Sequence, residues 1–328
     1  MPILWCGSED IDFPVGGTVV VSTTASHFRA GYARCAIHGS AVYLHSNPFP
    51  AGAVTSCWLT FFSYEPSNIT TSDFLAGLVL SSTAASGLWV GSSTSSRTRL
   101  ALFTFDGTTK VQLAAESGDS LSPAVINRID VQLVNYGATA TVNVYLNETL
   151  LITFSGDVRV GALVNIDAVG LRGEIAGGNF INCSEFIVAD EDTRSFPGLV
   201  TLALTGAGTT DDWTGVYSTI NQTTLSDAAP NYTNVSDKDQ QFNITDLPAG
   251  TFDIKAIKIS ARAAKAAGTP TQIALGYNSG GAVAVGPTLA LTEAYATYEE
   301  LDSVNPVTGV AFVQSEMNAL QLNARSKA

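Results

Sequence analysis

Charged side chains are scarce in this chain, and basic ones are the scarcest. Only 14% of its 328 residues are charged, and 16 basic residues against 29 acidic ones give a formal net charge of −13. A chain this acidic is repelled by phosphate backbones and by anionic membrane surfaces. No run of Lys or Arg offers a local exception. We therefore expect no nucleic-acid partner.

Long apolar runs are missing as well. The three longest stretches without a charged residue, 35–64, 74–96 and 266–292, are each interrupted by Ser, Thr, Asn, Gly or Pro. A membrane span needs ~20 mainly apolar residues. The N-terminus has no basic residue before its short apolar patch, which is not the pattern of a signal peptide. We expect no membrane insertion.

Cysteine is rare and is never paired at metal-binding spacing. The chain contains no Cys-X-X-Cys, so we expect reduced thiols and no cofactor. One group, Cys35, His38 and His45 with His27 nearby, has ligand types that zinc accepts. Residues three apart on a strand face opposite sides, so we interpret the group as one core cysteine and surface or loop histidines. The four cysteines are Cys6, Cys35, Cys57 and Cys183.

Signals for catalysis are weak. The stretch 118–121 reads Gly-Asp-Ser-Leu, the nucleophile block of one hydrolase class, but all three histidines precede Ser120, whereas that class has its His after the Ser. Glu185 lies in a strand-like run in which the next residue on its face is Ile187, so it has no acidic partner there. We expect no catalytic residues and no enzyme. A glycosidase needs a pair of carboxylates, but the clustered carboxylates of this chain fall in expected loops, where we interpret them as solvated. For Asp190 and Asp192 the alternative interpretation is that they bind a calcium ion. These clusters are Asp10/Asp12, Asp190/Glu191/Asp192 and Asp211/Asp212.

The clearest positive signal in the sequence is an alternation of apolar and polar residues with a period of two, which is typical of β-strands. It runs through 129–133 and 141–146, and the break at Asn147-Glu-Thr before 150–154 predicts a hairpin. Asp106-Gly107 predicts a second one. Many short strands separated by Gly, Ser and Asn are typical of sandwiches and barrels. The sequence predicts an all-β fold with two β-sandwich, jelly-roll-like domains in tandem.

A change of composition marks the domain boundary. Charges are concentrated at 190–194, and a Pro-Gly turn follows at 197–198. We expect a jelly-roll domain over 1–197 and a smaller β-sandwich over 198–328, whose best strand is 252–262. A short helix near the C-terminus is expected to have Ser315 as its N-cap.

Two tryptophans, Trp58 and Trp89, lie in strand-like runs and are expected in the core. Trp213 lies in a polar loop beside two aspartates. We interpret it as packing at the domain interface, with stacking on a sugar or a partner chain as the alternative.

The order of these features resembles a known family. The matching residues in the first domain are the hairpin strand 141–147, the strand end 187–190 and the linker 196–201; in the second they are 212–213, 231–236, 242–248, 254–263, 291–295, 305–309 and 317–320. They resemble the concanavalin A-like (LamG-like jelly-roll) domain, and the domain that follows it, in structural proteins of tailed bacteriophages. Two positions depart from the family pattern: Ala311-Phe-Val stands where a Trp is common, and Ser184-Glu185 where an Asp pair is common.

The resemblance implies a non-catalytic virion structural protein: a tail or collar fibre, a spike or a head decoration subunit. It implies other virion proteins as partners, a homo-oligomer such as a trimer, assembly in the bacterial cytoplasm and location in the virion. A host surface glycan is a further candidate partner. The alternatives are a carbohydrate-binding, lectin-like module and, behind it, a glycan-cleaving enzyme on the same fold.

Overall fold

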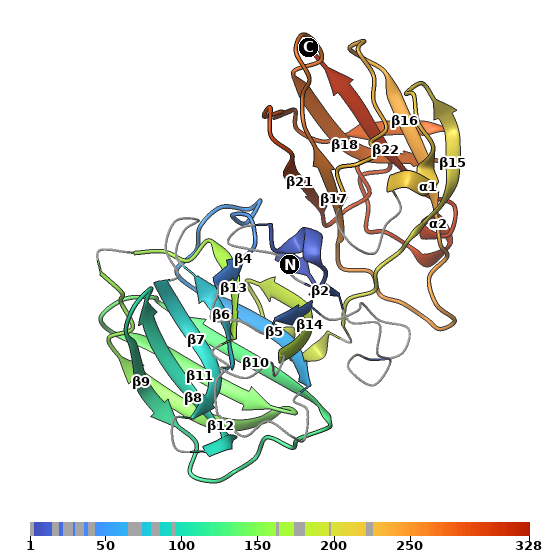
Figure 1. Ribbon diagram of the computed structural model, residues 1–328. Helices are drawn as coiled ribbons and strands as arrows, with labels where there is room; N and C mark the ends of the chain where they lie inside the picture. Colours follow the sequence, from blue (N-terminus) through green and yellow to red (C-terminus); the bar gives the residue numbers. More distant parts are fainter. Residues whose placement is uncertain are drawn as a thin grey trace. The chain divides into compact units, whose positions relative to one another are not determined.

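The computed structural model divides the chain into two compact units, Met1–Leu199 and Val200–Ala328 (Figure 1). The division lies close to the boundary expected at 197/198. The residues that the structure describes are 3–14, 20–21, 29, 36–38, 43–64, 74–79, 86–93, 96–161, 164–173, 181–196, 198–220 and 226–328.

Unit 1 consists of two antiparallel sheets, here named sheet A and sheet B. Sheet A contains, in spatial order, β12 (Thr149–Gly156), β11 (Ala140–Leu146), β10 (Ile126–Val134), β5 (Cys57–Tyr64), β14 (Ile181–Ala189), β3 (Ala36–His38) and β2 (Val20–Val21), with β1 (Ile3–Gly7) also paired to β14. Sheet B contains β4 (Tyr43–His45), β13 (Ala168–Gly173), β6 (Phe74–Val79), β7 (Ser86–Ser93), β8 (Ser96–Asp106) and β9 (Lys110–Ala115).

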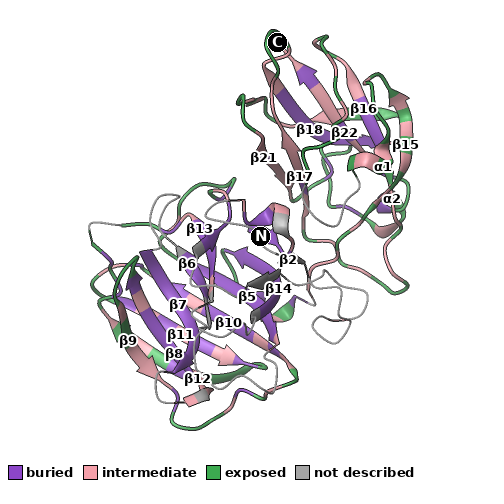
Figure 2. Ribbon diagram, in the orientation of Figure 1, coloured by how far each residue is buried: buried purple, intermediate pink, exposed green. Residues whose placement is uncertain are grey.

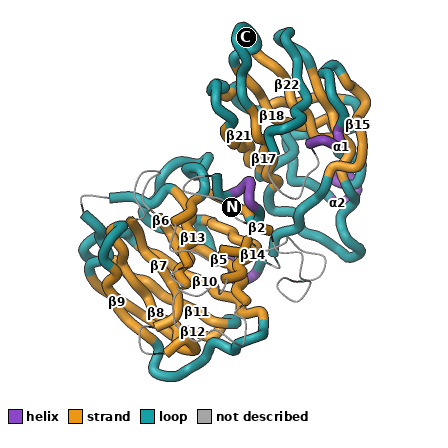
Figure 3. The backbone as a smooth tube through the Cα atoms, viewed as in Figure 1, coloured by secondary structure: helices purple, strands orange, loops and turns teal. Residues whose placement is uncertain are grey.

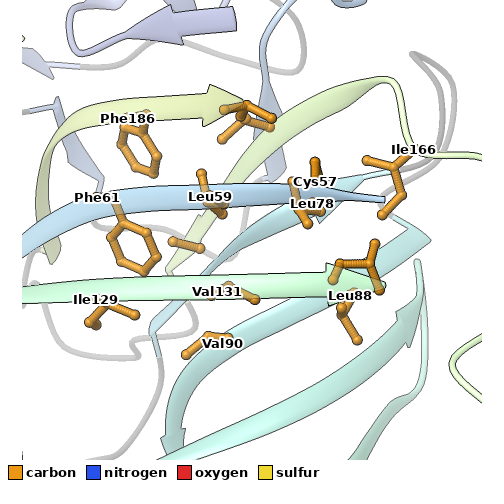
Figure 4. Close-up of a cluster of buried hydrophobic side chains, with 14 of the residues drawn as sticks. Cys57, Leu59, Phe61, Leu78, Leu88, Val90, Ile129, Val131, Ile166 and Phe186 are labelled. Atoms are coloured by element: carbon orange, nitrogen blue, oxygen red, sulfur yellow. The ribbon is translucent and has the colours of Figure 1, made fainter. Parts of the chain in front are cut away.

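The core of unit 1 comes directly from strand alternation. In β10, Ile129 and Val131 are buried among the residues between the sheets, beside Leu59 of β5 (Figure 4). Phe61 and Phe186 stack with their ring centroids 5.3 Å apart. Full burial of a side chain of this size stabilises the fold by roughly 1.5–3 kcal/mol. The alternate side chains of each strand point away from this core, to the outer face of their sheet.

Both predicted hairpins of unit 1 are confirmed. β11 pairs with β12 from Ala140↔Gly156 to Leu146↔Thr149. The two turn residues, Asn147 and Glu148, have φ of 47° and 70°, a left-handed conformation that asparagine accepts better than most residues. In the β8–β9 turn, Gly107 has a φ of 95°, which explains why glycine stands there.

Unit 2 is a smaller sandwich of sheets C and D. Its core contains Ile259 from sheet D and Ile273, Leu275 and Tyr277 from sheet C. Sheet C contains β15 (Leu204–Asp211), β16 (Asp239–Ile244), β22 (Gln321–Lys327), β18 (Gln272–Ser279) and β19 (Ala282–Val285), with β20 (Leu289–Ala290) also paired to β18; sheet D contains β17 (Ile257–Ala263) and β21 (Ala296–Asp302).

In the part of the chain that the structure describes, helices are few and short (Figure 3). The α-helices there are α1 (Tyr217–Ile220) and α2 (Gln314–Met317), and the 3-10 helices include η1 (Asp10–Asp12) and η3 (Thr193–Ser195). The N-cap position of α2 is Val313, so the prediction of Ser315 as its N-cap is wrong. No helix among the described residues is long and apolar enough to cross a membrane. The predicted fold class, all-β with two β-sandwich units, is confirmed.

Candidate functional site

The residues considered for metal binding are only partly described. Cys35 and His27 lie outside the described residues, as does the side chain of His38 in β3. His45 in β4 is buried, and its Nδ1 lies 2.6 Å from the Ser46 carbonyl oxygen. In the part of the chain that the structure describes, no group of three or more His, Cys, Asp or Glu is placed to hold a metal ion.

The Gly-Asp-Ser-Leu block lies in the turn between β9 and β10. The buried Glu116 carboxylate organises this turn, because its Oε1 accepts the backbone N–H groups of Leu100 (2.6 Å) and Ser120 (3.2 Å). Ser120 thus belongs to a capped turn. The sequence pointed the same way, because no histidine follows Ser120 in the chain.

The acidic clusters are also engaged in local contacts. The Asp12 carboxylate accepts the N–H groups of Ser8 and Glu9 at 2.7 and 2.9 Å, while the side chain of Asp10 lies outside the described residues. Asp212 lies 3.7 Å from the Lys238 ammonium. These carboxylates cap turns or pair with a cation.

Glu185 has a structural role that the sequence did not reveal. A register shift in β14 puts it in a bulge with a φ of 54°, so the expectation that it shares a face with Ile187 on a regular strand is wrong. The fully buried carboxylate is paired with Arg29 and accepts the Leu199 N–H at 3.0 Å. Burial raises the pKa of Glu185 despite the Arg29 guanidinium.

Trp213 lies within unit 2. Its Nε1 donates to the Lys238 carbonyl at 3.0 Å, and its ring packs, half-buried, against the core of that unit. A contact of Trp213 with a sugar or a partner chain stays a prediction.

A polar row crosses the outer face of sheet A, on the side away from the core. The row consists of Trp58 (β5), Gln132 (β10), Asn143 (β11) and Thr153 (β12), which are direct partners on four adjacent strands. Thr153 Oγ1 donates to Asn143 Oδ1 at 2.9 Å, and Asn143 Nδ2 donates to Gln132 Oε1 at 2.8 Å. Hydrogen bonds aligned in one chain polarise each other. Among the described residues the Gln132 amide nitrogen donates to none, so the chain ends in an open donor.

An aromatic pair and an arginine adjoin the polar row. Tyr145 of β11 stacks on Trp58 with the ring centroids 5.7 Å apart and the planes at 27°. The Arg194 guanidinium lies over both rings, 4.4 Å from the Tyr145 centroid and 5.1 Å from that of Trp58. Asp192 accepts from Arg194 Nε at 2.9 Å and Nη2 at 2.5 Å, and this arginine holds the pKa of Asp192 below its usual value. Trp58 is buried, whereas Tyr145 is half-buried.

The arginine belongs to a segment that we name the strap, whose described residues are 190–196 and 198–199 and which lies along the same face of sheet A. Arg128 Nη2 donates to the Thr193 carbonyl at 2.7 Å and to Asp130 Oδ1 at 3.1 Å. Thr60 Oγ1 lies 2.5 Å from both Asp130 Oδ1 and Thr193 Oγ1. Asp130 is fully buried, and burial raises its pKa more than Thr60 and Arg128 lower it.

The outer face of sheet B is apolar and aromatic where that of sheet A is polar. Trp89 and Phe103, direct partners on β7 and β8, are fully buried there with Phe105. Arg172 lies 4.2 Å from the Phe105 ring centroid and Lys110 lies 5.1 Å from that of Phe103. Trp58 and Trp89 are therefore buried as expected, but on outer faces of the two sheets and not between them.

Unit 2 contains a half-buried carboxylate pair on β21, Glu300 and Asp302. Burial, and then the charge of Asp302, raise the pKa of Glu300 to about 7. The backbone of Gly286 lies against this carboxyl group: a Cβ there would be 2.3 Å from Glu300 Cδ. An acid with a raised folded-state pKa stabilises the fold fully below its unfolded value of 4.5 and loses that contribution as pH rises through 7.

Glu300→Gln is therefore expected to reduce the loss of stability between pH 5 and pH 8. After allowance for solvent screening the reduction is about 1 kcal/mol. Thermal unfolding at the two pH values measures it, with the exposed Glu293→Gln as the control in the same unit. An equal pH dependence in both variants and in the unchanged chain would contradict this reading of Glu300.

Comparison with protein-family models finds no match, and comparison with curated sequences finds none. Solved structures with a similar chain path include the endo-β-1,4-glucuronan lyase of the fungus Trichoderma reesei, at a TM-score of 0.43 and 8% identity over 58% of this chain and 96% of that one. The alginate lyase Aly36B is similar at 0.37 and 10%, over 61% and 100%. Domain 4 of AbnA, an extracellular arabinanase of Geobacillus stearothermophilus, in complex with arabinotriose, is similar at 0.33 and 14%, over 60% and 83%.

These three proteins have names that refer to carbohydrates, and none is a virion protein. The prediction that the chain is not an enzyme is corrected by this finding, because lyases are among the solved structures with a similar arrangement of strands. At these identities and TM-scores the likeness concerns the chain path alone and assigns no substrate to this chain.

Proposed function

We propose that unit 1 is a carbohydrate-binding module and that the polar row with Tyr145 is its binding surface. The observation that carries the proposal is a sheet face on which the half-buried Gln132 and Asn143 and the exposed Thr153 are hydrogen-bonded in line, beside a stacked Trp–Tyr pair. Sugars combine hydroxyl groups, which amides and threonine can both donate to and accept from, with apolar C–H faces that pack on aromatic rings.

The surface is held rigid, which favours binding. Gln132 and Asn143 are fixed on neighbouring strands of a sheet and by their mutual bond, so little side-chain entropy is lost when a ligand binds. The half-buried Tyr145 is held in place by its contacts with Trp58 and Arg194. Thr153 on the edge strand β12 is exposed.

Replacing Tyr145 or Asn143 with alanine is expected to weaken glycan binding at least about 10-fold, the loss typical of a well-placed contact. Binding is measured first on an array of immobilised glycans and then by calorimetry with the best ligand. The control is Thr141→Ala, on the same strand and outside the row. Equal glycan binding by all three variants would contradict the proposal that the polar row with Tyr145 is the binding surface.

We also propose a role for the chain as a structural protein of a bacteriophage virion, acting as a homo-oligomer, such as a trimer, with other virion proteins as partners. Unit 2 supports this proposal: among the described residues, eight of the twelve large hydrophobic side chains that are exposed lie in it, the smaller unit. Exposed apolar side chains are common at protein–protein contacts. Quantitative mass spectrometry of purified particles tests it, and absence of the chain from particles would contradict it.

A further inference from the structure

The positive charges around the polar row are compensated. The four residues of the row are uncharged, and the two arginines that adjoin it from β10 and the strap are each in an ion pair. Arg194 is paired with Asp192 at 2.5 Å, and Arg128 with Asp130 at 3.1 Å. The surface therefore offers no uncompensated positive charge.

This balance distinguishes the row from a surface that recognises an acidic polymer. Recognition of carboxylates depends on arginine or lysine groups whose donors face the ligand. Here the Nε and Nη2 atoms of Arg194 already donate to Asp192, and those of Arg128 donate to Asp130 and the Thr193 carbonyl. The chain as a whole has a net charge of −13, which repels a polyanion further.

We infer that the ligand of the polar row is a neutral glycan, and that a glycan with carboxylate or sulfate groups on each residue is excluded. This inference rests on the proposed function of unit 1 and adds its ligand class. The donor at Gln132, the hydroxyl of Thr153 and the ring of Tyr145 suit hydroxyl groups and C–H groups, and none of them carries a positive charge that would compensate a carboxylate or sulfate.

The test uses the full chain on an array of neutral, carboxylated and sulfated glycans, followed by calorimetry of the strongest ligand in 50 and 500 mM NaCl. The expected ligand is neutral, and its Kd changes less than about 2-fold between the two salt concentrations, because no charge is there to be screened. An acidic ligand whose affinity falls about 10-fold in high salt would overturn the inference and leave carbohydrate binding standing.

A gain of function provides the second arm. Asp192→Asn leaves the Arg194 charge uncompensated, so binding of an acidic hexasaccharide of (1→4)-linked uronates is expected to rise at least about 5-fold in 50 mM NaCl and to fall again in 500 mM. The control is Asp157→Asn, which removes the partner of Arg159 in a pair outside the row. An equal response of the two variants would overturn the inference. Failure of every glycan to bind, or neutral binding that Tyr145→Ala does not affect, would overturn the proposed function as well.

Discussion

Replacing Asp130 with alanine is expected to lower the free energy of unfolding of unit 1 by about 3 kcal/mol or more, since a buried cation is left without its anion. The side chain of Arg128 is only 13% exposed and that of Asp130 is fully buried. Without the carboxylate, the hydrogen bonds that Arg128 keeps are those to the carbonyl oxygens of Thr193 and Phe196 in the strap. The guanidinium that holds the strap would lose the anion that fixes it on sheet A.

Urea unfolding of the full chain, followed by tryptophan fluorescence, measures the effect, because three of the four tryptophans lie in unit 1. The midpoint is expected to fall by about 1 M or more. The control, Asp157→Ala, breaks an exposed pair with Arg159 and should leave the midpoint unchanged.

A double variant separates the loss of the pair from the loss of one partner. Arg128→Met with Asp130→Leu removes both charges, and most of the stability is expected to return. If Asp130→Ala alone leaves the midpoint where it was, the buried pair does not hold the strap.

Gly77→Ala is expected to destabilise unit 1 by about 3 kcal/mol, the upper part of the usual range for overpacking. Gly77 lies on β6 between Gly170 of β13 and Trp89 of β7. A Cβ at this position would lie 2.2 Å from the Leu88 carbonyl oxygen and 2.8 Å from the Trp89 Cα, and both are backbone atoms of the neighbouring strand. The strands would have to move apart.

The matched control is Gly118→Ala. Gly118 is exposed, and nothing lies within 4 Å of the Cβ that alanine would add. The control should stay within about 0.5 kcal/mol of the unchanged chain in the same urea experiment. Similar midpoints for Gly77→Ala and Gly118→Ala would show that β6 and β7 can separate without cost.

Local patterns in the sequence were sufficient for the hairpin strands and turns of unit 1, whereas the strand expected at 252–262 begins only at Ile257, as β17. The alternation through 141–146 fixes which side chains of β11 face the core, and Asn147 marks its turn. The bulge at Glu185 could not be read from local alternation, and its carboxylate has partners outside the strand, Arg29 and the Leu199 N–H.

The candidate site was visible only in part. Gln132 and Asn143 could be assigned to outer faces from alternation, but their alignment depends on the register of β10 against β11, which tertiary packing sets. Trp58 was expected in the core because it lies in a strand-like run. It stacks on Tyr145 across the intervening strand β10, which only the strand order of the sheet reveals. Arg194 contacts both rings from the charged stretch 190–194, which the sequence marked as a domain boundary.

The measurement that tests the central claim most directly is a crystal structure of the chain with its best array ligand. The account predicts a sugar on the outer face of sheet A, with hydroxyl groups in hydrogen-bonding distance of Gln132 and Asn143 and C–H groups against the exposed part of Tyr145. A sugar bound elsewhere, on the outer face of sheet B or on unit 2, with the polar row empty would contradict it.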